Sequence, residues 1–248
     1  MTEPGGKVAI VTGASRGLGR AVAAELARRG MAVVLGARGG EDCAGAAAEI
    51  TAAGGQALGQ ACDVTDYAEV ERLAATARAR FGGLHVVINN AAVIEPIAPL
   101  ASSDPALWAR SISVNLTGVY NGMRACLPHF IAQGSGVAVN LTTSAARIPF
   151  AGWSAYCAAK AGIAMLTAVA QKEVGAAGIR VHDLAPGPMD TDMQATIHAT
   201  GLNIAPAGLH GVEGPARLAA WLCTDEAADL AGREANFMDT DLRRRAGI

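Results

Sequence analysis

The stretch KVAIVTGASRGLG at residues 7–19 joins a short apolar run to a glycine-rich turn. Residues 7–12 are rich in β-branched side chains, which is typical of a buried strand. Residues 20–30 then place apolar side chains on one side of a helix and charged ones on the other. Glycine lets a backbone come close to a ligand, and a helix N-terminus offers free N–H groups to an anion. The stretch therefore predicts a phosphate-binding strand–turn–helix unit, with the spacing Gly-x3-Gly-x-Gly in place of the common Gly-x-Gly-x-x-Gly.

The rest of the chain alternates between strand-like and helix-like segments. We expect strands near residues 7–12, 32–36, 57–61, 86–89, 136–141, 180–184 and 234–238, and helices near 17–29, 41–53, 66–81, 104–132, 154–175 and 215–223. Alternation of this kind predicts a parallel sheet with right-handed crossovers. The expected fold class is α/β, a doubly wound parallel sheet of about seven strands with helices on both faces. We expect one domain spanning residues 1–248, because no repeat or low-complexity linker divides the chain.

The composition excludes several classes of protein. A length of 248 residues suits one large domain with a substantial core. Hydrophobic residues make up 51% and charged residues 17%, which fits a sheet buried on both faces and also buried subunit contacts. A net charge of −2 gives no electrostatic footprint for nucleic acid. The apolar run at residues 161–170 is too short to span a bilayer, and residues 1–6 are too short and polar for a secretion signal.

Cysteine and histidine usage is consistent with that picture. Five cysteines, an odd number without a Cys-x-x-Cys pair, favour free thiols in a reducing compartment. The five histidines are scattered without the spacing of metal ligands, so we expect no metal. These features together predict a cytoplasmic protein that binds neither nucleic acid nor membranes.

A tyrosine and a lysine stand four residues apart in the sequence AYCAAK at residues 155–160. If this segment is helical, Tyr156 and Lys160 lie on one face. A free tyrosine has a pKa of about 10, which is too high for efficient proton transfer at neutral pH. A fixed positive charge nearby favours the phenolate and lowers that pKa. The pair therefore indicates a tuned acid/base, although the same spacing also occurs by chance on amphipathic helices.

Two arginines bear on the choice of cofactor. Dinucleotide folds that prefer NAD usually carry an acidic residue near the end of the second strand, where it holds the ribose 2′-hydroxyl. Here that position is Ala37, followed by Arg38, and Arg16 lies inside the glycine turn. Arginine binds phosphate through planar, bidentate contacts. The sequence therefore favours NADP over NAD, the alternative being that both arginines are ordinary solvated surface residues.

With these features in place, the chain resembles the short-chain dehydrogenase/reductase family over nearly its whole length. Residues 12–19 resemble that family's Thr-Gly-x3-Gly-x-Gly turn, residues 89–92 its Asn-Asn-Ala-Gly segment with Ala92 in place of Gly, and residues 156–160 its Tyr-x3-Lys motif. The resemblance implies a Rossmann-like fold and an NAD(P)-dependent oxidoreductase acting on CH–OH or C=O groups. It implies cofactor contacts at Gly13, Ser15, Arg16, Gly17, Leu18, Gly19, Arg38, Asp63, Val64, Asn90, Ala91, Tyr156, Lys160, Pro186, Gly187, Met189 and Thr191.

The resemblance also implies the remaining catalytic residues. Asn115 matches the helix Asn that helps hold a proton-relay water, and Lys160 matches the residue that tunes the tyrosine and contacts the nicotinamide ribose. The family's active-site Ser lies thirteen residues before the Tyr, which is Thr143 in this chain. Threonine keeps a hydroxyl with the same donor and acceptor capacity, so Thr143 is the first candidate. Ser144 is the alternative if the loop is shifted by one residue.

Two segments depart from the regular alternation. The apolar segment at about residues 188–211 follows the sixth strand, where it is placed to close over a ligand as a lid; a plain surface helix and loop is the alternative. Near the C-terminus, residues 241–245 have the sequence Asp-Leu-Arg-Arg-Arg. We interpret this arginine run as a solvated tail or a last helical turn.

Trp153 either lines an aromatic substrate pocket or caps the core.

The sequence thus favours NADPH-dependent reduction of a ketone to an alcohol, with Tyr156 as the general acid/base. Within the family, residues 152–157 and 190–194 resemble sepiapterin and benzil reductases, and the glycine turn with Arg38 resembles 3-oxoacyl-carrier-protein reductases. The alternatives are an NAD-linked alcohol dehydrogenase of the same family and a non-catalytic NADP-binding member. The partners implied are a small carbonyl or alcohol substrate and further copies of the chain, in a dimer or tetramer.

Overall fold

A seven-stranded parallel sheet forms the centre of the molecule in a computed structural model, which describes residues 6–200 and 208–248. The strand order is β3-β2-β1-β4-β5-β6-β7, which is the expected doubly wound, Rossmann-like arrangement. The strands are β1 (Val8–Thr12), β2 (Ala32–Ala37), β3 (Gln56–Ala61), β4 (Val86–Asn89), β5 (Gly136–Leu141), β6 (Ile179–Ala185) and β7 (Glu234–Asn236). The described helices are α1 (Gly17–Arg28), α2 (Gly40–Ala52), α3 (Tyr67–Phe81), α4 (Pro105–Ile112), α5 (Gly118–Gln133), α6 (Ser154–Val174), α7 (Asp192–Ala199), α8 (Glu213–Leu222) and α9 (Thr240–Arg245).

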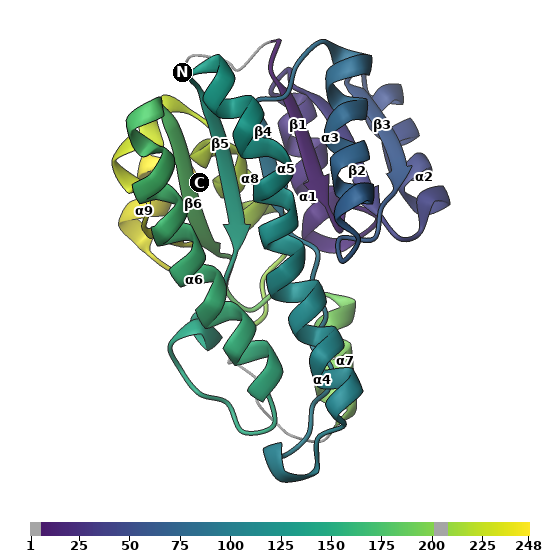
Figure 1. Ribbon diagram of the computed structural model, residues 1–248, viewed down its shortest axis with the longest axis vertical. Coiled ribbons are helices and arrows are strands. Elements are labelled where there is room, and N and C mark those ends of the chain that lie inside the picture. The colour runs from purple at the N-terminus through teal and green to yellow at the C-terminus, as the bar shows by residue number, and fades with distance from the viewer. Residues whose placement is uncertain (1–5, 201–207) are drawn as a thin grey trace.

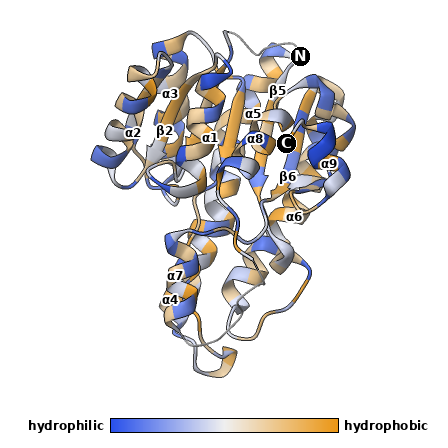
Figure 2. Ribbon diagram, turned by 180° about the vertical axis from the view of Figure 1, so that it is seen from behind, coloured by the Kyte–Doolittle hydropathy of each residue, from blue (hydrophilic) through white to orange (hydrophobic). Residues whose placement is uncertain are grey.

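Two hydrophobic layers cover the two faces of the sheet (Figure 1). Side chains alternate between faces along a strand, so Val8 and Ile10 point into one layer while Ala9 and Val11 point into the other. Helices α3, α5 and α6 pack on the first layer, and α1, α2 and α8 on the second. Apolar strand colouring between the helices is visible from behind in Figure 2. The predicted doubly wound parallel sheet is thus confirmed. Because helices cover both of its faces, its central strands are nearly continuous runs of apolar residues.

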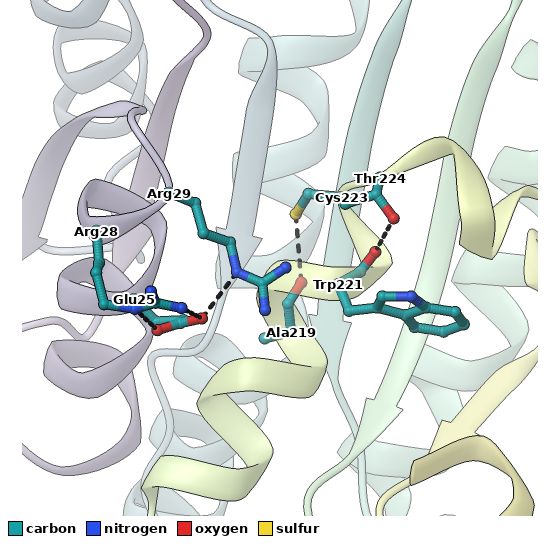
Figure 3. A network of polar contacts seen from close by, with 7 residues as sticks. All are labelled: Glu25, Arg28, Arg29, Ala219, Trp221, Cys223 and Thr224. Atoms are coloured by element: carbon teal, nitrogen blue, oxygen red, sulfur yellow. Dashed lines mark hydrogen bonds and ion pairs between the residues drawn. The ribbon is translucent and has the colours of Figure 1, made fainter. Parts of the chain in front are cut away.

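Helix α1 is held against α8 on the second layer, and Figure 3 shows the polar contacts at this junction. On α1, Glu25 accepts hydrogen bonds from Arg28 and Arg29, each 2.7 Å from a carboxylate oxygen. These bonds hold the pKa of Glu25 below its usual value although burial opposes them. At the end of α8, Cys223 Sγ donates to the Ala219 carbonyl at 3.3 Å. The hydrogen bonds drawn in Figure 3 lie within each helix, and α1 packs against α8 through the apolar side chains of the second layer.

The parallel strands all end at one edge of the sheet, where α4, α7 and the start of α6 extend beyond it (Figure 1). The helix expected at 104–132 is a continuous helical run, but a π-helical turn at Ser113–Thr117 separates α4 from α5. None of the helices in the described part of the chain has the length and apolar character that a membrane crossing needs.

The C-terminal arginines form a last helix, α9, and not a solvated tail. Arg245 makes a two-pronged ion pair with Asp229, with its shorter contact at 2.7 Å, and its guanidinium lies 5.4 Å from the ring centre of Trp221. Arg243 lies over the ring of Phe237 in the same way. Leu242 is buried between them in the second hydrophobic layer. The arginine run therefore docks the end of the chain onto α8 and β7.

Candidate active site

The glycine turn between β1 and α1 has a backbone that only glycine adopts easily. Gly13 has φ +63° and Gly17 has φ +55°, both in the left-handed region. A Cβ atom on Gly19 would lie 2.3 Å from the Gly13 carbonyl oxygen, so this position has no room for a side chain. No side chain caps the N-terminus of α1, whose first N–H groups stay free for an anion. These features fit the pyrophosphate of a dinucleotide.

The segment after β4 closes the same turn from the other side. Asn90 Nδ2 donates to the carbonyl oxygens of Thr12 and Gly13, both at 3.0 Å. In return, Thr12 Oγ1 accepts hydrogen bonds from the backbone N–H groups of Asn90 and Ala91. A Cβ atom on Gly13 would lie 2.7 Å from Ala91 Cα. The structure thus brings Asn90 and Ala91 directly against the glycine turn, as a shared cofactor site requires.

The predicted adenosine end lies at the carboxyl ends of β2 and β3. Asp63 Oδ1 accepts hydrogen bonds from Thr65 N at 2.9 Å and from Thr65 Oγ1 at 2.8 Å. The backbone bond from Thr65, with a further contribution from the Arg38 charge, holds the pKa of Asp63 below its usual value. Arg38 is exposed and Ala37 half-buried. Arg38 and Asp63 follow the paired strand ends Ala37 and Ala61, so they lie close together at this edge of the sheet.

The segment after β6 returns to the glycine turn. Gly187 has φ +77°, and a Cβ atom there would lie 2.7 Å from His210 Nε2. Met189 pairs with His210 in a short parallel bridge. Thr191 Cγ2 lies 3.9 Å from where a Cβ atom on Gly17 would stand. The segment from Pro186 to Thr191 thus reaches the glycine turn at Thr191, although more than 160 residues separate the two in sequence.

Arg16 lies at this same junction. Its Nη1 is 2.9 Å from a carboxylate oxygen of Asp192, the first residue of α7. Both side chains are more than 70% exposed, and exposed ion pairs contribute only about 0–1 kcal/mol. The contact is therefore weak enough for Arg16 to exchange Asp192 for a phosphate.

Tyr156 and Lys160 share the buried face of α6, as their spacing predicts. They are 8% and 3% exposed, and Lys160 Nζ lies 5.3 Å from the centre of the Tyr156 ring. Lys160 Nζ donates a hydrogen bond to the Leu141 carbonyl oxygen at 2.6 Å, at the end of β5. The lysine is therefore fixed beneath the tyrosine by the sheet.

The pKa of Tyr156 differs from the sequence-based expectation. Burial raises the pKa of Tyr156 above its usual value, so within this chain the expected lowering is not found. Burial also lowers the pKa of Lys160 to about 8, against the opposing charge of Asp183. The physical reason is that the sequence shows the spacing of the pair but not the desolvation of both groups. Tyr156 is protonated at neutral pH as a result.

Asn115 lies in the π-helical turn between α4 and α5 and is completely buried. Its Oδ1 accepts from Val93 N at 2.9 Å, and its Nδ2 donates to Val93 O at 2.8 Å and to Ser111 Oγ at 3.1 Å. Both amide hydrogens are used in these bonds. The Asn115 side chain therefore braces the loop after β4, and its Oδ1 retains one acceptor site besides the bond from Val93 N.

The two candidate hydroxyls follow β5. Thr143 is half-buried and has an extended backbone, whereas Ser144 is exposed and begins a 3₁₀ turn at Ser144–Ala146. Neither hydroxyl forms a hydrogen bond with another described residue. Both remain available to a carbonyl oxygen, with Thr143 the more enclosed of the two.

An apolar cluster surrounds Tyr156. Trp153 meets the Tyr156 ring edge to face at 5.8 Å between ring centres, and Phe150 lies 5.1 Å from Trp153. Ile94 from the loop after β4 and Ile197 from α7 are buried in the same cluster. Sequence reasoning missed Phe150 and Ile94, since nothing in their local sequence marks them.

The described part of the expected lid segment, 188–200 and 208–211, agrees with a covering role. Met193 and Ile197 of α7 pack against the Trp153–Tyr156 cluster. Residues 201–207, which include the apolar Leu202, Ile204 and Pro206 of that expectation, lie outside the described residues.

Comparisons with known proteins agree with this arrangement. The family model described as short chain dehydrogenase matches residues 7–201. The chain is 42% identical over 233 residues to the cis-4-hydroxycyclohexanecarboxylate dehydrogenase of Sinomonas cyclohexanicum, covering 91% of this chain and 92% of that protein. It is 34% identical to the 3-oxoacyl-acyl-carrier-protein reductase of Escherichia coli, covering 92% and 93%. A variant of the actinorhodin polyketide ketoreductase, in a crystal structure with NADPH, superposes with a TM-score of 0.86 at 28% identity, covering 95% and 96%.

Proposed function

Because this chain belongs to the short-chain dehydrogenase family, whose members are NAD(P)-dependent oxidoreductases acting on CH–OH or C=O groups, we propose that it reduces a ketone reversibly with NADPH. The observation that carries the proposal is the buried face of α6. It presents Tyr156, with Lys160 beneath it, at the carboxyl edge of the sheet beside an apolar cluster. A glycine turn fitted to a pyrophosphate lies at the same edge.

In the proposed reaction, Tyr156 gives its proton to the substrate oxygen. Burial raises the pKa of Tyr156, which opposes proton release, so the reaction needs a positive charge that stabilises the phenolate as it forms. Thr143, or Ser144 in its place, donates a hydrogen bond that holds this oxygen. Lys160, whose Nζ lies 5.3 Å from the centre of the phenol ring, supplies that charge. When bound, the nicotinamide cofactor supplies the hydride.

The cofactor site is proposed to comprise the glycine turn, the segment after β4, and the segment after β6. Asn90 and Ala91 shape the turn, and Thr191 borders it on the opposite side. Arg38 beside Asp63 supports NADP over NAD, since a guanidinium suits a 2′-phosphate and no acid occupies position 37.

A ring-shaped substrate is the second part of the proposal. The cluster of Phe150, Trp153 and Ile94 places apolar and aromatic side chains next to Tyr156. One relative is named for a hydroxycyclohexane carboxylate, which supports an alicyclic alcohol or ketone. An NAD-linked alcohol dehydrogenase is the alternative; the same relative is named a dehydrogenase, which supports action on an alcohol.

A screen of cyclic and linear ketones that follows NADPH absorbance tests the proposal. Tyr156→Phe keeps the ring but removes the proton donor, so kcat should fall by about 10²–10⁴-fold on any substrate found. NADPH binding should change little. Turnover of Tyr156→Phe close to that of the unmodified protein would show that another group is the acid.

A further inference from the structure

One carboxylate on the last strand touches both ends of the segment that carries the candidate hydroxyls. Glu234 Oε1 accepts a hydrogen bond from Arg147 Nη1 at 2.7 Å, and its Oε2 accepts a longer one from Thr142 Oγ1 at 3.3 Å. Thr142 directly precedes Thr143, and Arg147 follows the turn at Ser144–Ala146. A single side chain thus joins the beginning and the end of the loop.

The loop between these two contacts is short and internally bonded. Thr142 is 2% exposed, and its backbone N–H donates to the Leu184 carbonyl on β6 at 2.8 Å. Ala146 N donates to Thr143 O, and Arg147 N donates to Ser144 O, both at 2.9 Å. The first end of the loop is therefore fixed on the sheet. The second end is held by Ala145, which is buried in the cluster around Tyr156, and by the side-chain contact between Arg147 and Glu234.

The carboxyl group next to Glu234 has a different partner. Asp183 pairs with Glu234 in register across β6 and β7, so two carboxyl groups stand on neighbouring strands. Asp183 Oδ1 accepts a hydrogen bond from Thr167 Oγ1 at 2.5 Å on α6. Asp183 is therefore bonded to α6, whereas Glu234 is bonded to Thr142 and Arg147 of the loop.

Burial makes this contact stronger than an ordinary surface pair. The Glu234 side chain is 10% exposed, and that of Arg147 is 58% exposed. A carboxylate that is mostly removed from water keeps its cationic partner more firmly than an exposed one does. The bond to Glu234 also raises the pKa of Arg147.

We propose that Glu234 is a positioning residue that sets where the hydroxyl of Thr143, or of Ser144, meets the substrate oxygen. It acts through Arg147 and Thr142 and does not touch the substrate. The inference rests on the proposed function, because it requires a hydroxyl of this loop to take part in carbonyl reduction. Misplacing a reacting group by about 1 Å can lower the rate by about 10²-fold, so the contact is worth testing kinetically.

The test compares Glu234→Gln, Arg147→Gln and the double variant on a ketone found by the screen. Glu234→Gln keeps the shape but removes the charge, and kcat should fall at least about tenfold with KM for NADPH unchanged. Arg147→Gln should give a similar loss. Because both act on one loop, the double variant should be no slower than the slower single variant.

Asp225→Asn serves as the matched control. It removes the 3.1 Å ion pair between Asp225 and Arg180, at the opposite end of β6. It should leave kcat unchanged. Thermal unfolding of each variant shows whether it is folded; if Glu234→Gln does not fold, Arg147→Gln carries the test alone, because its side chain is largely exposed.

The outcomes separate this inference from the proposed function. An unchanged kcat in a folded Glu234→Gln or Arg147→Gln protein, or losses that add in the double variant, would overturn the positioning role. So would a parallel loss of NADPH binding. Thr143→Val and Ser144→Ala complete the set: if both keep full turnover, the proposed role of the hydroxyl is itself wrong. If one is impaired while Glu234→Gln is not, only the inference about Glu234 fails.

Discussion

At the scale of single residues, two neighbours on β6 have pKa values displaced in opposite directions. His182 is fully buried, and its ring lies beside the Leu230 backbone. Burial, with the Arg180 charge, lowers the pKa of His182 to about 4. Asp183 faces the other side of the sheet, where burial raises its pKa to about 7. Folding thus leaves both groups neutral near pH 6, which avoids the free-energy cost of burying a charge.

These displacements predict opposite pH effects on the free energy of unfolding. Below its usual value of 6.5, unfolded His182 binds a proton that the folded form refuses, so this residue destabilises the fold as pH falls toward 4. Asp183 behaves inversely: the folded form keeps a proton that the unfolded carboxyl loses above 3.8, so its contribution falls as pH rises toward 7. At about 1.4 kcal/mol per pH unit, each effect reaches a few kcal/mol.

Urea unfolding of two variants between pH 4 and pH 7 checks this prediction, with protein concentration held constant. The stability gained by Asp183→Asn over the unmodified protein should be largest near pH 7 and shrink as pH falls. The gain from His182→Asn should instead grow as pH falls below 6.5. If the free energy of unfolding of each variant ran parallel to that of the unmodified protein across this pH range, neither pKa displacement would exist.

We expect single residues to decide the choice of cofactor as well. Arg38 is exposed beside Asp63, and Ala37 leaves the ribose without an acid. Losing one hydrogen bond to a charged phosphate costs about 1.5–3 kcal/mol, so Arg38→Ala should weaken NADPH by roughly 10–150-fold with NADH little affected. Arg38→Asp should reverse the preference. Steady-state kinetics with both cofactors measures this, and better use of NADH by the unmodified protein would refute the preference.

At the scale of elements, the strands were predictable within one or two residues. In β1 and β5, for example, β-branched runs are buried and bounded by glycine, so the local signal is strong. The π-helical turn was not predictable, because it occurs where Asn115 bonds to Val93 across the site. A contact of this kind between distant segments leaves no mark in local sequence.

The sequence before the C-terminal helix α9 contains a helix N-cap signal, although no helix was expected there beyond a possible last turn. Asp239 caps α9, with its Oδ1 accepting from Asp241 N at 2.9 Å and from Leu242 N at 3.1 Å. An Asp before a short charged segment is an N-cap signature. Helix α7 had no comparable signal at Thr191, whose side chain makes no cap hydrogen bond.

Some features of the candidate site were likewise predictable from the sequence, and others were not. Linear motifs predicted Tyr156, Lys160 and the glycine turn, because their spacing along one element already fixes their geometry. The raised pKa of Tyr156 depends on Ile94 and Ile197, which come from distant segments. The Glu234 contact likewise depends on pairing between β6 and β7. Chemistry set by tertiary burial was out of reach of the sequence.

At the scale of the whole molecule, apolar side chains are exposed on the outer faces of α5 and α6. Tyr120 and Ile131 on α5 are each 49% exposed, and Met165 and Val169 on α6 are 66% and 42% exposed. Residues 165 and 169 are one helical turn apart, and 120 and 131 are three turns apart, so each pair shares a face. Adjacent exposed apolar residues on two packed helices are typical of a subunit interface.

We therefore expect a homo-oligomer, a dimer or tetramer, that contacts its partner through α5 and α6. Met165→Glu would place a charge within that contact and leave it unpaired, which costs several kcal/mol on association, and each 1.4 kcal/mol raises the dissociation constant about tenfold. Light scattering at micromolar concentration should give a multiple of the chain mass for the unmodified protein and a smaller species for Met165→Glu. Leu100→Glu is the control, because Leu100 is 73% exposed but belongs to the 3₁₀ turn Leu100–Ser102 and not to α5 or α6. An unmodified protein that scatters as a single chain would refute the interface, and dissociation of the Leu100 variant alone would place the contact elsewhere.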